Sequence, residues 1–273
     1  LSAMLTNGQE LADWLADLTH RPAYYFHDQW KPSRQARGVV MYPRQEFKPI
    51  YEFMRRRERD PKLQSPGFPA TAYALFGLQQ NWAPDTPTDT KVVRLLQDPV
   101  EIKAGMYGPA PNANAVAALL AERAAGTRLK TVVFVQQAAH APSTAKKLSG
   151  RLSGAGQLTA AEQAYVGDIE IELGGIERSL VNPTAGAVPH NGDMLPLERR
   201  LAESLFRRDD GVNVIVATPT LAQGINLPAQ LAILAGNKRH GDEGRDDLDP
   251  HEILNAAGRA GRAGYLANGA VLL

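Results

Sequence analysis

The chain contains no cysteine among its 273 residues. This absence excludes a disulfide framework, cysteine-ligated zinc, iron–sulfur centres and a thiol nucleophile. The stretch that begins at His251 resembles the start of a zinc-protease helix, but Asn255 stands where a second histidine is required. Since the six histidines form no tight ligand cluster, we predict no metal site on this chain. The lack of cysteine also fits a reducing compartment, and we expect a cytoplasmic protein.

An excess of charge of either sign is also absent. Thirty Lys and Arg residues face 29 Asp and Glu residues, which leaves a net charge of +1. Overall electrostatics therefore argue neither for nor against a nucleic-acid partner, and any binding surface must be local. The first residues lack the basic segment of a signal peptide and an initiator methionine, so we expect a piece of a longer protein.

A long uncharged stretch from Val212 to Asn237 could be taken for a membrane span. Prolines and polar residues interrupt it, however, and Asn226 and Pro228 lie well inside it. Two buried strands around a polar loop fit this pattern better, and we predict no contact with a membrane.

After residue 112, apolar strands and amphipathic helices alternate with short connections. This order predicts an α/β fold, in which a mainly parallel sheet carries helices on both faces in three αβα layers. Ligands of such folds sit at the carboxyl ends of the strands. The expected strands cover 132–135, 187–188, 212–217, 231–235 and 269–273, and the expected helices cover 115–125, 142–152, 160–171, 196–208 and 249–264.

The part of the chain before residue 112 is less regular. A helix is predicted from residue 8, with Leu11, Trp14, Leu15 and Leu18 on one face, and a short strand over 39–42. Residues 43–99 contain many prolines and read as an insertion with some helix. Its charged run, 55–59, is interpreted either as a solvated face or as a patch that touches phosphates, and both readings remain open.

The segment from Asn255 to Arg262 carries the most informative pattern. On a continuous helix, Asn255, Arg259 and Arg262 stand at i, i+4 and i+7 and share one face. Gly258 and Gly261 lie beside them without side chains, so another surface can approach closely. Two guanidinium groups and an amide on such a face suit a polyphosphate, because arginine neutralises charge on a transferring phosphoryl group. The alternative is a solvated arginine face.

Two further segments could hold a phosphate. Over 217–229 a buried strand ends in a threonine-rich turn that contains Thr218 and leads to Gly224 and Asn226. Threonine hydroxyls and backbone N–H groups at such a junction can bind phosphate, although an ordinary loop would have the same composition. The His190-Asn191-Gly192 turn is a weaker signal of the same kind.

A phosphate cradle is absent from the sequence. There is no Gly-x-x-x-x-Gly-Lys-Ser/Thr loop, and no Asp-Glu pair follows an apolar strand to hold magnesium, since Asp242-Glu243 lies in a predicted polar loop. The chain therefore offers candidate arginine fingers without the site on which they would act.

Taken in order, these segments resemble the second RecA-like domain of superfamily 2 helicases, most closely the Ski2-like group. The match runs across most of the chain. The segments that carry it resemble motif III (1–7), motif IV (131–137), the His-x-Gly…Glu-Arg…Phe segment (190–206), motif V (217–229) and motif VI (255–262). Motifs V and VI in this order are highly specific.

The resemblance implies roles for individual residues. Arg259 and Arg262 would reach ATP that a first RecA-like domain binds together with Mg2+, and Arg262 is the expected finger. Gly224 and Asn226 would approach the nucleotide from this side. The residues expected to contact the backbone of DNA or RNA, single-stranded during translocation, are Thr218, Asn191, Gly192 and Gln136.

The resemblance also implies a domain organisation and two departures. Residues 1–30 would be the tail of the first RecA-like domain plus a linker, and residues 31–273 the second domain with its insertion at about 43–99. Asn255 replaces a glutamine placed near the attacking water and is one methylene shorter. Met4 replaces a threonine of motif III.

Three interpretations follow from the sequence. The leading one is the second motor domain of an ATP-dependent helicase or translocase, which alone should hydrolyse almost no ATP. A nucleic-acid-binding module with a degenerate motor fold and no ATPase cycle is the first alternative. An α/β enzyme that acts on a phosphate substrate is the second, and it predicts turnover by this chain alone without added nucleic acid.

Overall fold

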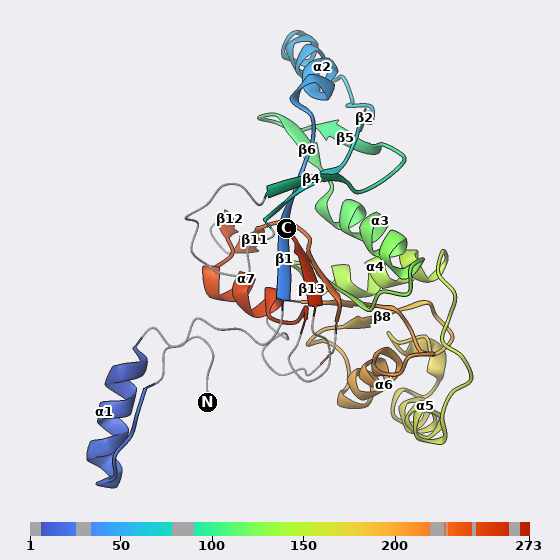
Figure 1. Cartoon of the computed structure of the whole chain (residues 1–273). Helices are drawn as coiled ribbons and strands as arrows, with labels where there is room; N and C mark the ends of the chain where they lie inside the picture. The colour runs from blue at the N-terminus through green and yellow to red at the C-terminus, as the bar shows by residue number, and fades with distance from the viewer. Residues whose placement is uncertain are drawn as a thin grey trace.

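The computed structural model of the chain describes residues 7–25, 34–77, 90–218, 227, 229–241, 244–261 and 268–273. Its centre is an eight-stranded sheet (Figure 1). The strand order is β4 (Thr90–Arg94), β3 (Tyr73–Gly77), β1 (Arg34–Met41), β13 (Asn268–Leu272), β10 (Leu231–Leu234), β7 (Thr131–Phe134), β9 (Val214–Ala217) and β8 (Ala187–His190). All pairs from β1 to β8 are parallel, whereas β3 and β4 add antiparallel pairs at one side.

Helices cover both faces of this sheet, as predicted. Alternate strand residues point to opposite faces: Val133 packs with α3 (Ala113–Ala125) and α4 (His140–Ser149), whereas Val132 packs with α6 (Pro196–Arg207) and α7 (Pro250–Ala257). A further helix, α5 (Ala160–Leu173), packs against α6. The predicted three-layer α/β fold is therefore confirmed. Within the described ranges, no helix is both long and apolar enough to cross a membrane.

Element boundaries match the sequence predictions best in the parallel part of the sheet. Two differences lie after residue 237. The expected polar loop around residue 242 is a hairpin of β11 (Lys238–Gly241) and β12 (Gly244–Asp247). The helix expected to end at Gly264 ends at Ala257, and the reason for this lies in contacts described below.

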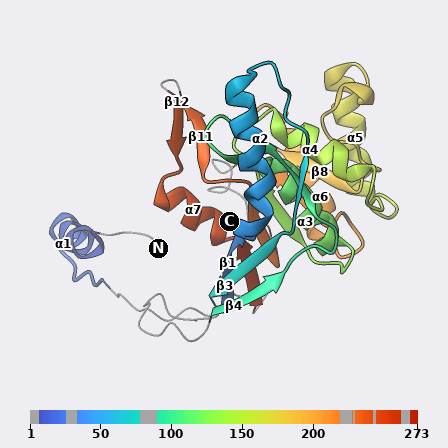
Figure 2. The same cartoon turned by 90° about the horizontal axis from the view of Figure 1, so that it is seen from above.

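The insertion is more ordered and longer than its sequence indicated. After a 3-10 turn (Arg44–Phe47), helix α2 (Lys48–Arg59) packs near a small sheet. That sheet has the order β2 (Phe68–Ala70), β5 (Val100–Ala104) and β6 (Pro109–Pro111), so the insertion continues to Pro111 rather than ending near residue 99. It also supplies β3 and β4, which lie beside β1 in Figure 2. Short strands rich in proline give too weak an alternation to be read from sequence.

The predicted N-terminal helix is confirmed as α1 (Gly8–Thr19). Its apolar face is largely open, since Trp14 is 56% and Leu18 is 62% exposed in the described structure. The assignment of residues 1–30 to a preceding domain stays a prediction, and the motif III residues 1–6, including Met4, lie outside the described residues.

Candidate functional site

Three of the four residues predicted to contact a nucleic-acid strand follow neighbouring strands of the sheet. Phe134 on β7 and His190 on β8 both pair with Ala217 on β9, and all three strands are parallel. Gln136, Asn191 and Thr218 therefore emerge at the same carboxyl edge. The Gln136 side chain donates a hydrogen bond of 2.9 Å to the carbonyl of Gly236, which follows β10 at this edge. The topology thus brings these sequence-predicted residues together.

Asn191 uses its side chain inside the protein. It is 1% exposed, its Nδ2 donates to the Ala138 carbonyl at 2.8 Å, and its Oδ1 accepts from the Asp193 N–H at 3.1 Å. The bond to Ala138 ties the turn after β8 to the loop after β7, and the bond from Asp193 holds the turn itself. Gly192 next to it is exposed and has open space in front of its Cα. Gly192, rather than the Asn191 side chain, therefore offers an accessible group at this turn.

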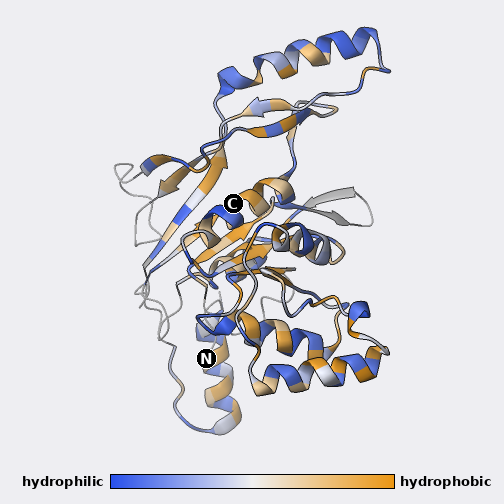
Figure 3. Cartoon of the chain, turned by 90° about the vertical axis from the view of Figure 1, so that its right-hand side faces the viewer, coloured by the Kyte–Doolittle hydropathy of each residue, from blue (hydrophilic) through white to orange (hydrophobic). Residues whose placement is uncertain are grey.

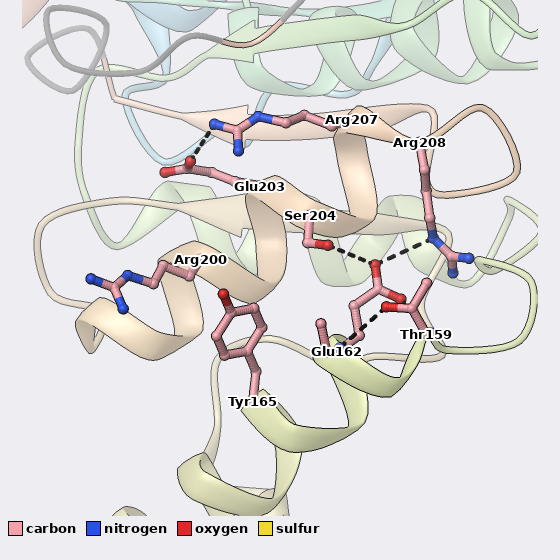
Figure 4. Close-up of a pocket in the computed structure, with 9 residues that line it drawn as sticks. Thr159, Glu162, Tyr165, Arg200, Glu203, Ser204, Arg207 and Arg208 are labelled. Carbon is pink, nitrogen blue, oxygen red and sulfur yellow. Dashed lines mark hydrogen bonds and ion pairs between the residues drawn. The ribbon is translucent and has the colours of Figure 1, made fainter.

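A hollow between α5 and α6 contains none of the residues predicted from the sequence (Figure 4). Its buried carboxylate, Glu162, accepts hydrogen bonds from Ser204 and from the backbone of Thr159, and it forms an ion pair of 3.3 Å with Arg208. At its other end, Glu203 bonds the ring of buried His190, which holds the pKa of Glu203 below its usual range. These charges are mutually satisfied, so the hollow is a helix–helix junction rather than the predicted site.

The turn that carries Arg259 follows a helix with a well-defined start. Asp249 and Glu252 form a capping box around Pro250, as the sequence predicted. The helix stops at Ala257, and Arg259 lies in the turn that comes next. The prediction that Asn255 and Arg259 share one helical face is therefore wrong, because Arg259 lies beyond the end of the helix. Arg262 itself lies outside the described residues.

Long-range backbone contacts explain why the helix stops. Gly261 has φ +65°, a left-handed conformation that interrupts a right-handed helix, and its N–H donates to the Ala229 carbonyl at 3.0 Å. Ala260 forms a parallel bridge with Ala229. A Cβ placed on Gly261 would lie 2.8 Å from the nitrogen of Gly269. Glycine does permit a close approach here, as predicted, but the approaching surface is the chain's own backbone.

Gln35 on β1 holds both ends of this turn. It pairs in register with Gly269, and its Nε2 donates to the carbonyls of Ala257 at 2.6 Å and Ala260 at 2.9 Å. Its Oε1 accepts from the Nε and Nη2 of Arg37, two residues along the same strand face, at 3.0 and 2.9 Å. Burial lowers the pKa of Arg37. Sequence reasoning missed Gln35, because β1 begins at Arg34, five residues before the predicted strand 39–42.

The Arg259 turn lies at the amino edge of the sheet, opposite the predicted strand contacts. Gln35, Ala229 and Gly269 all stand at or just before the starts of parallel strands. The segment 218–229 therefore runs from the carboxyl end of β9 to the amino end of β10. Gly224 and Asn226 belong to this segment but lie outside the described residues. Thr218 and its neighbours thus lie at the carboxyl edge, where the sequence predicted them, and Arg259 lies at the opposite edge.

Comparison with known proteins gives a family match over part of the chain. Residues 168–264 match the helicase conserved C-terminal domain, a range that includes the turn after β8, Thr218 and the Arg259 turn. This part of the chain is similar to a helicase C-terminal domain, and the relatives that share it include Ski2-like helicases. The chain is 38% identical over 88 residues to the antiviral helicase SKI2 of Saccharomyces cerevisiae, and 45% identical over 76 residues to the ATP-dependent DNA helicase Hel308 of Thermoplasma volcanium.

The shared segments are short relative to these proteins. They cover 32% and 28% of this chain but only 7% and 11% of SKI2 and Hel308. A third relative, the chloroplastic DExH-box ATP-dependent RNA helicase DExH15 of Arabidopsis thaliana, is 43% identical over 89 residues, or 32% of this chain and 7% of its own length. These relatives include both a DNA helicase and an RNA helicase, so similarity in this segment does not indicate whether the nucleic acid is DNA or RNA.

Proposed function

We propose that this helicase C-terminal domain is the second motor domain of an ATP-dependent helicase or translocase. It would supply arginines to ATP held mainly by a first RecA-like domain, and backbone contacts to a DNA or RNA strand. The observation that carries the proposal is the Arg259 turn, which Gln35 and the Gly261–Gly269 contact fix at one edge of the sheet. The residues predicted to contact the nucleic-acid strand lie at the other edge of the sheet.

A fixed turn is what an arginine finger requires. Arginine stabilises a transferring phosphoryl group only when its guanidinium is held where negative charge develops. The carbonyls at a helix C-terminus make that region electronegative and hence unfavourable for a polyphosphate. By donating to the Ala257 and Ala260 carbonyls, Gln35 offsets part of that field. Asn255, one turn earlier on α7, would orient the attacking water, with the shorter reach noted above.

The strand side of the proposal rests on groups that contact phosphate without reading sequence. Thr218 and Gln136 offer a hydroxyl and an amide at the carboxyl edge, and Gly192 offers open backbone. The segment 218–229 links this edge to the Arg259 turn through the Ala229–Ala260 bridge. Closure of two motor domains around ATP would therefore shift the strand contacts through this segment.

In this proposal, magnesium is bound only together with ATP. Among the described residues, no group of three or more His, Asp and Glu side chains is placed to hold a metal ion. We therefore derive no step through magnesium on this chain and assign the ion to the first RecA-like domain. For the same reason, we expect the chain alone to hydrolyse almost no ATP.

Substitution of the two arginines in the intact protein tests the proposal. Arg259→Ala and Arg262→Ala should each lower nucleic-acid-stimulated ATP turnover by about a thousandfold or more, as loss of an arginine finger does elsewhere. Strand binding, measured by fluorescence anisotropy, should stay within about twofold of wild type, because phosphate contacts at the other edge are untouched. Arg123→Ala, an exposed arginine on α3, is the matched control.

Two results would contradict the motor interpretation. Unchanged ATP turnover in both variants, with strand binding intact, would favour a nucleic-acid-binding module without an ATPase cycle. Phosphate release by this chain alone, independent of any added strand, would favour an enzyme with a different phosphate substrate.

A further inference from the structure

We propose that the insertion carries a second contact surface for the phosphate backbone of the nucleic-acid strand. The surface consists of Arg44, Lys48, Arg55 and Arg59, and we call it the α2 basic face. It lies outside residues 168–264, which match the helicase family. The inference rests on the proposed function, because the ligand is the strand on which the motor would act.

Helix α2 has two faces of opposite character. Ile50 and Phe53 are buried against the small sheet, and Arg57 on the same side donates to the carbonyls of Ala104, at 3.1 Å, and Gly105. Arg57 therefore holds the insertion together and is not available for a ligand. The opposite face carries three exposed cations at i, i+7 and i+11, namely Lys48, Arg55 and Arg59. The charged run thus divides into a structural arginine and an outward-facing stripe.

The four cations of the α2 basic face form no ion pair and no side-chain hydrogen bond within the described part of the chain. Some exposed arginines elsewhere do pair: Arg151 bonds Glu122 at 3.0 Å and Arg207 bonds Glu203 at 2.8 Å. On the α2 basic face, Glu52 lies beside Lys48 and Arg55, but no ion pair among the described residues joins it to them.

The same face is hollowed and contains an aromatic ring. Arg44, Lys48, Tyr51 and Arg55 line an open hollow together with Gln45 and Glu52. Tyr51 is 45% exposed between the cations. Surfaces that bind single strands combine cations for phosphates with rings on which bases stack, a pairing that an acidic protein segment would not use. From Lys48 to Arg59 the helix spans about 16 Å, enough for several nucleotides.

The position of the insertion is consistent with a nucleic-acid strand as the ligand. It begins where β1 ends, and β1 runs parallel with the strands that precede Gln136 and Thr218. The insertion therefore leaves the main sheet from the carboxyl edge, where the strand contacts are predicted. Figure 3 shows α2 as a mostly hydrophilic helix at one end of the molecule. A nucleic-acid strand that crosses the carboxyl edge of the sheet would therefore continue onto the α2 basic face without changing direction.

Removing the charges of three residues of the α2 basic face in the intact protein tests the inference. The triple variant Lys48→Gln/Arg55→Gln/Arg59→Gln should bind labelled oligodeoxythymidine and oligouridine about tenfold or more weakly. The slope of log affinity against log salt should shrink by about 2, as expected for three lost single-strand phosphate contacts. Tyr51→Ala should cost about tenfold in affinity, while Tyr51→Phe should keep it, because stacking needs the ring alone. Maximal ATP turnover at saturating strand should stay at the wild-type value.

A matched variant controls for net charge. Arg123→Gln/Lys146→Gln/Lys147→Gln removes the same charge from exposed positions on α3 and α4, and it should change neither affinity nor salt slope. Equal losses in the two triple variants, or wild-type binding by the α2 variant with its fold verified by thermal unfolding, would overturn the inference. So would equal competition for the α2 basic face by polyglutamate. If the wild-type protein binds no strand and shows no strand-stimulated ATPase, the proposed function itself fails, and the inference fails with it.

Discussion

The two edges of the main sheet are held together by different kinds of contact. At the carboxyl edge, side chains bridge neighbouring loops: Gln136 bonds the Gly236 carbonyl and Asn191 bonds the Ala138 carbonyl. At the amino edge, the Lys130 side chain also bridges neighbouring segments, but around the Arg259 turn backbone meets backbone at Gly261 and Gly269, and Gln35 bonds two carbonyls of the turn. Side-chain bridges can be exchanged at low cost as a ligand comes and goes, whereas a backbone contact fixes geometry. The carboxyl edge is therefore suited to contacts with a nucleic-acid strand, and the amino edge to a guanidinium held in a fixed position.

The largest effect is expected on stability, when one glycine at each edge of the sheet is replaced by alanine. Gly261→Ala should destabilise the protein by about 2 kcal/mol or more, because φ +65° is strained for alanine and the new Cβ would meet Gly269 at 2.8 Å. Gly192→Ala, where the space is open, should cost less than about 0.5 kcal/mol. Urea unfolding measures both. Similar costs at the two positions would show that the amino edge is not the more rigid one.

Removing one glutamine at each edge should separate turnover from binding. Gln35→Leu removes the partner of two carbonyls and one acceptor of Arg37, so the Arg259 turn should loosen and ATP turnover at saturating nucleic-acid strand should fall by about tenfold to a hundredfold. The affinity of this variant for the nucleic-acid strand should stay at the wild-type value. Gln136→Leu should show the reverse, with weaker strand binding and unchanged maximal turnover. The measurements are steady-state ATPase and anisotropy on the intact protein, and a shared defect in both variants would contradict the separation.

A smaller effect is expected where the carboxyl edge relies on one amide. Asn191→Ala removes the bond to Ala138 and the acceptor for the Asp193 N–H, which should cost about 1–2 kcal/mol in the free energy of unfolding. Strand affinity should fall only a few-fold, since the amide would act by holding Gly192 in place. Asn191→Asp keeps the acceptor for Asp193 and should recover part of the loss. A large loss of affinity with no change in stability would instead indicate direct contact with the strand.

The smallest effect concerns the pH dependence of the amino edge. Lys130, just before β7, donates to the carbonyls of Arg208 at 2.7 Å and Val212 at 2.8 Å, and burial lowers its pKa to about 8. Between that value and the ordinary 10.5, the unfolded chain binds a proton that the folded protein has released, so this group makes stability rise with pH across that window. Lys130→Arg stays charged and should lack the rise. Urea unfolding at several pH values compares the two proteins, and identical pH profiles would exclude the effect.

The parallel sheet was predictable because its strands are buried on both faces and read as apolar runs. Val132 to Val135 and Val214 to Ala217 needed no tertiary information, and the strand ends then placed Gln136 and Thr218 correctly at one edge. The insertion was harder to predict, since its short strands contain prolines that obscure the alternation. The polar hairpin after residue 237 was missed because its residues have low strand propensity.

The amino edge could not be predicted from local pattern. The helix spacing from Asn255 onward is consistent with a longer helix, and only the contact of Gly261 with Gly269 and Ala229 ends it. Gln35 was missed because its acceptors lie 222 and 225 residues away in the sequence. Residues whose partners are this distant carry no periodic signal, so their roles become visible only in the folded chain.

The contact between Gly261 and Gly269 also has a mechanical consequence. With no side chain between the two backbones, nothing compressible separates the Arg259 turn from β13. Rotation of the turn must therefore carry β13 with it, and β1 follows because it is hydrogen-bonded along β13. The far end of β1 leads into the insertion, so an unbroken run of backbone contacts connects the Arg259 turn to the segment that carries α2.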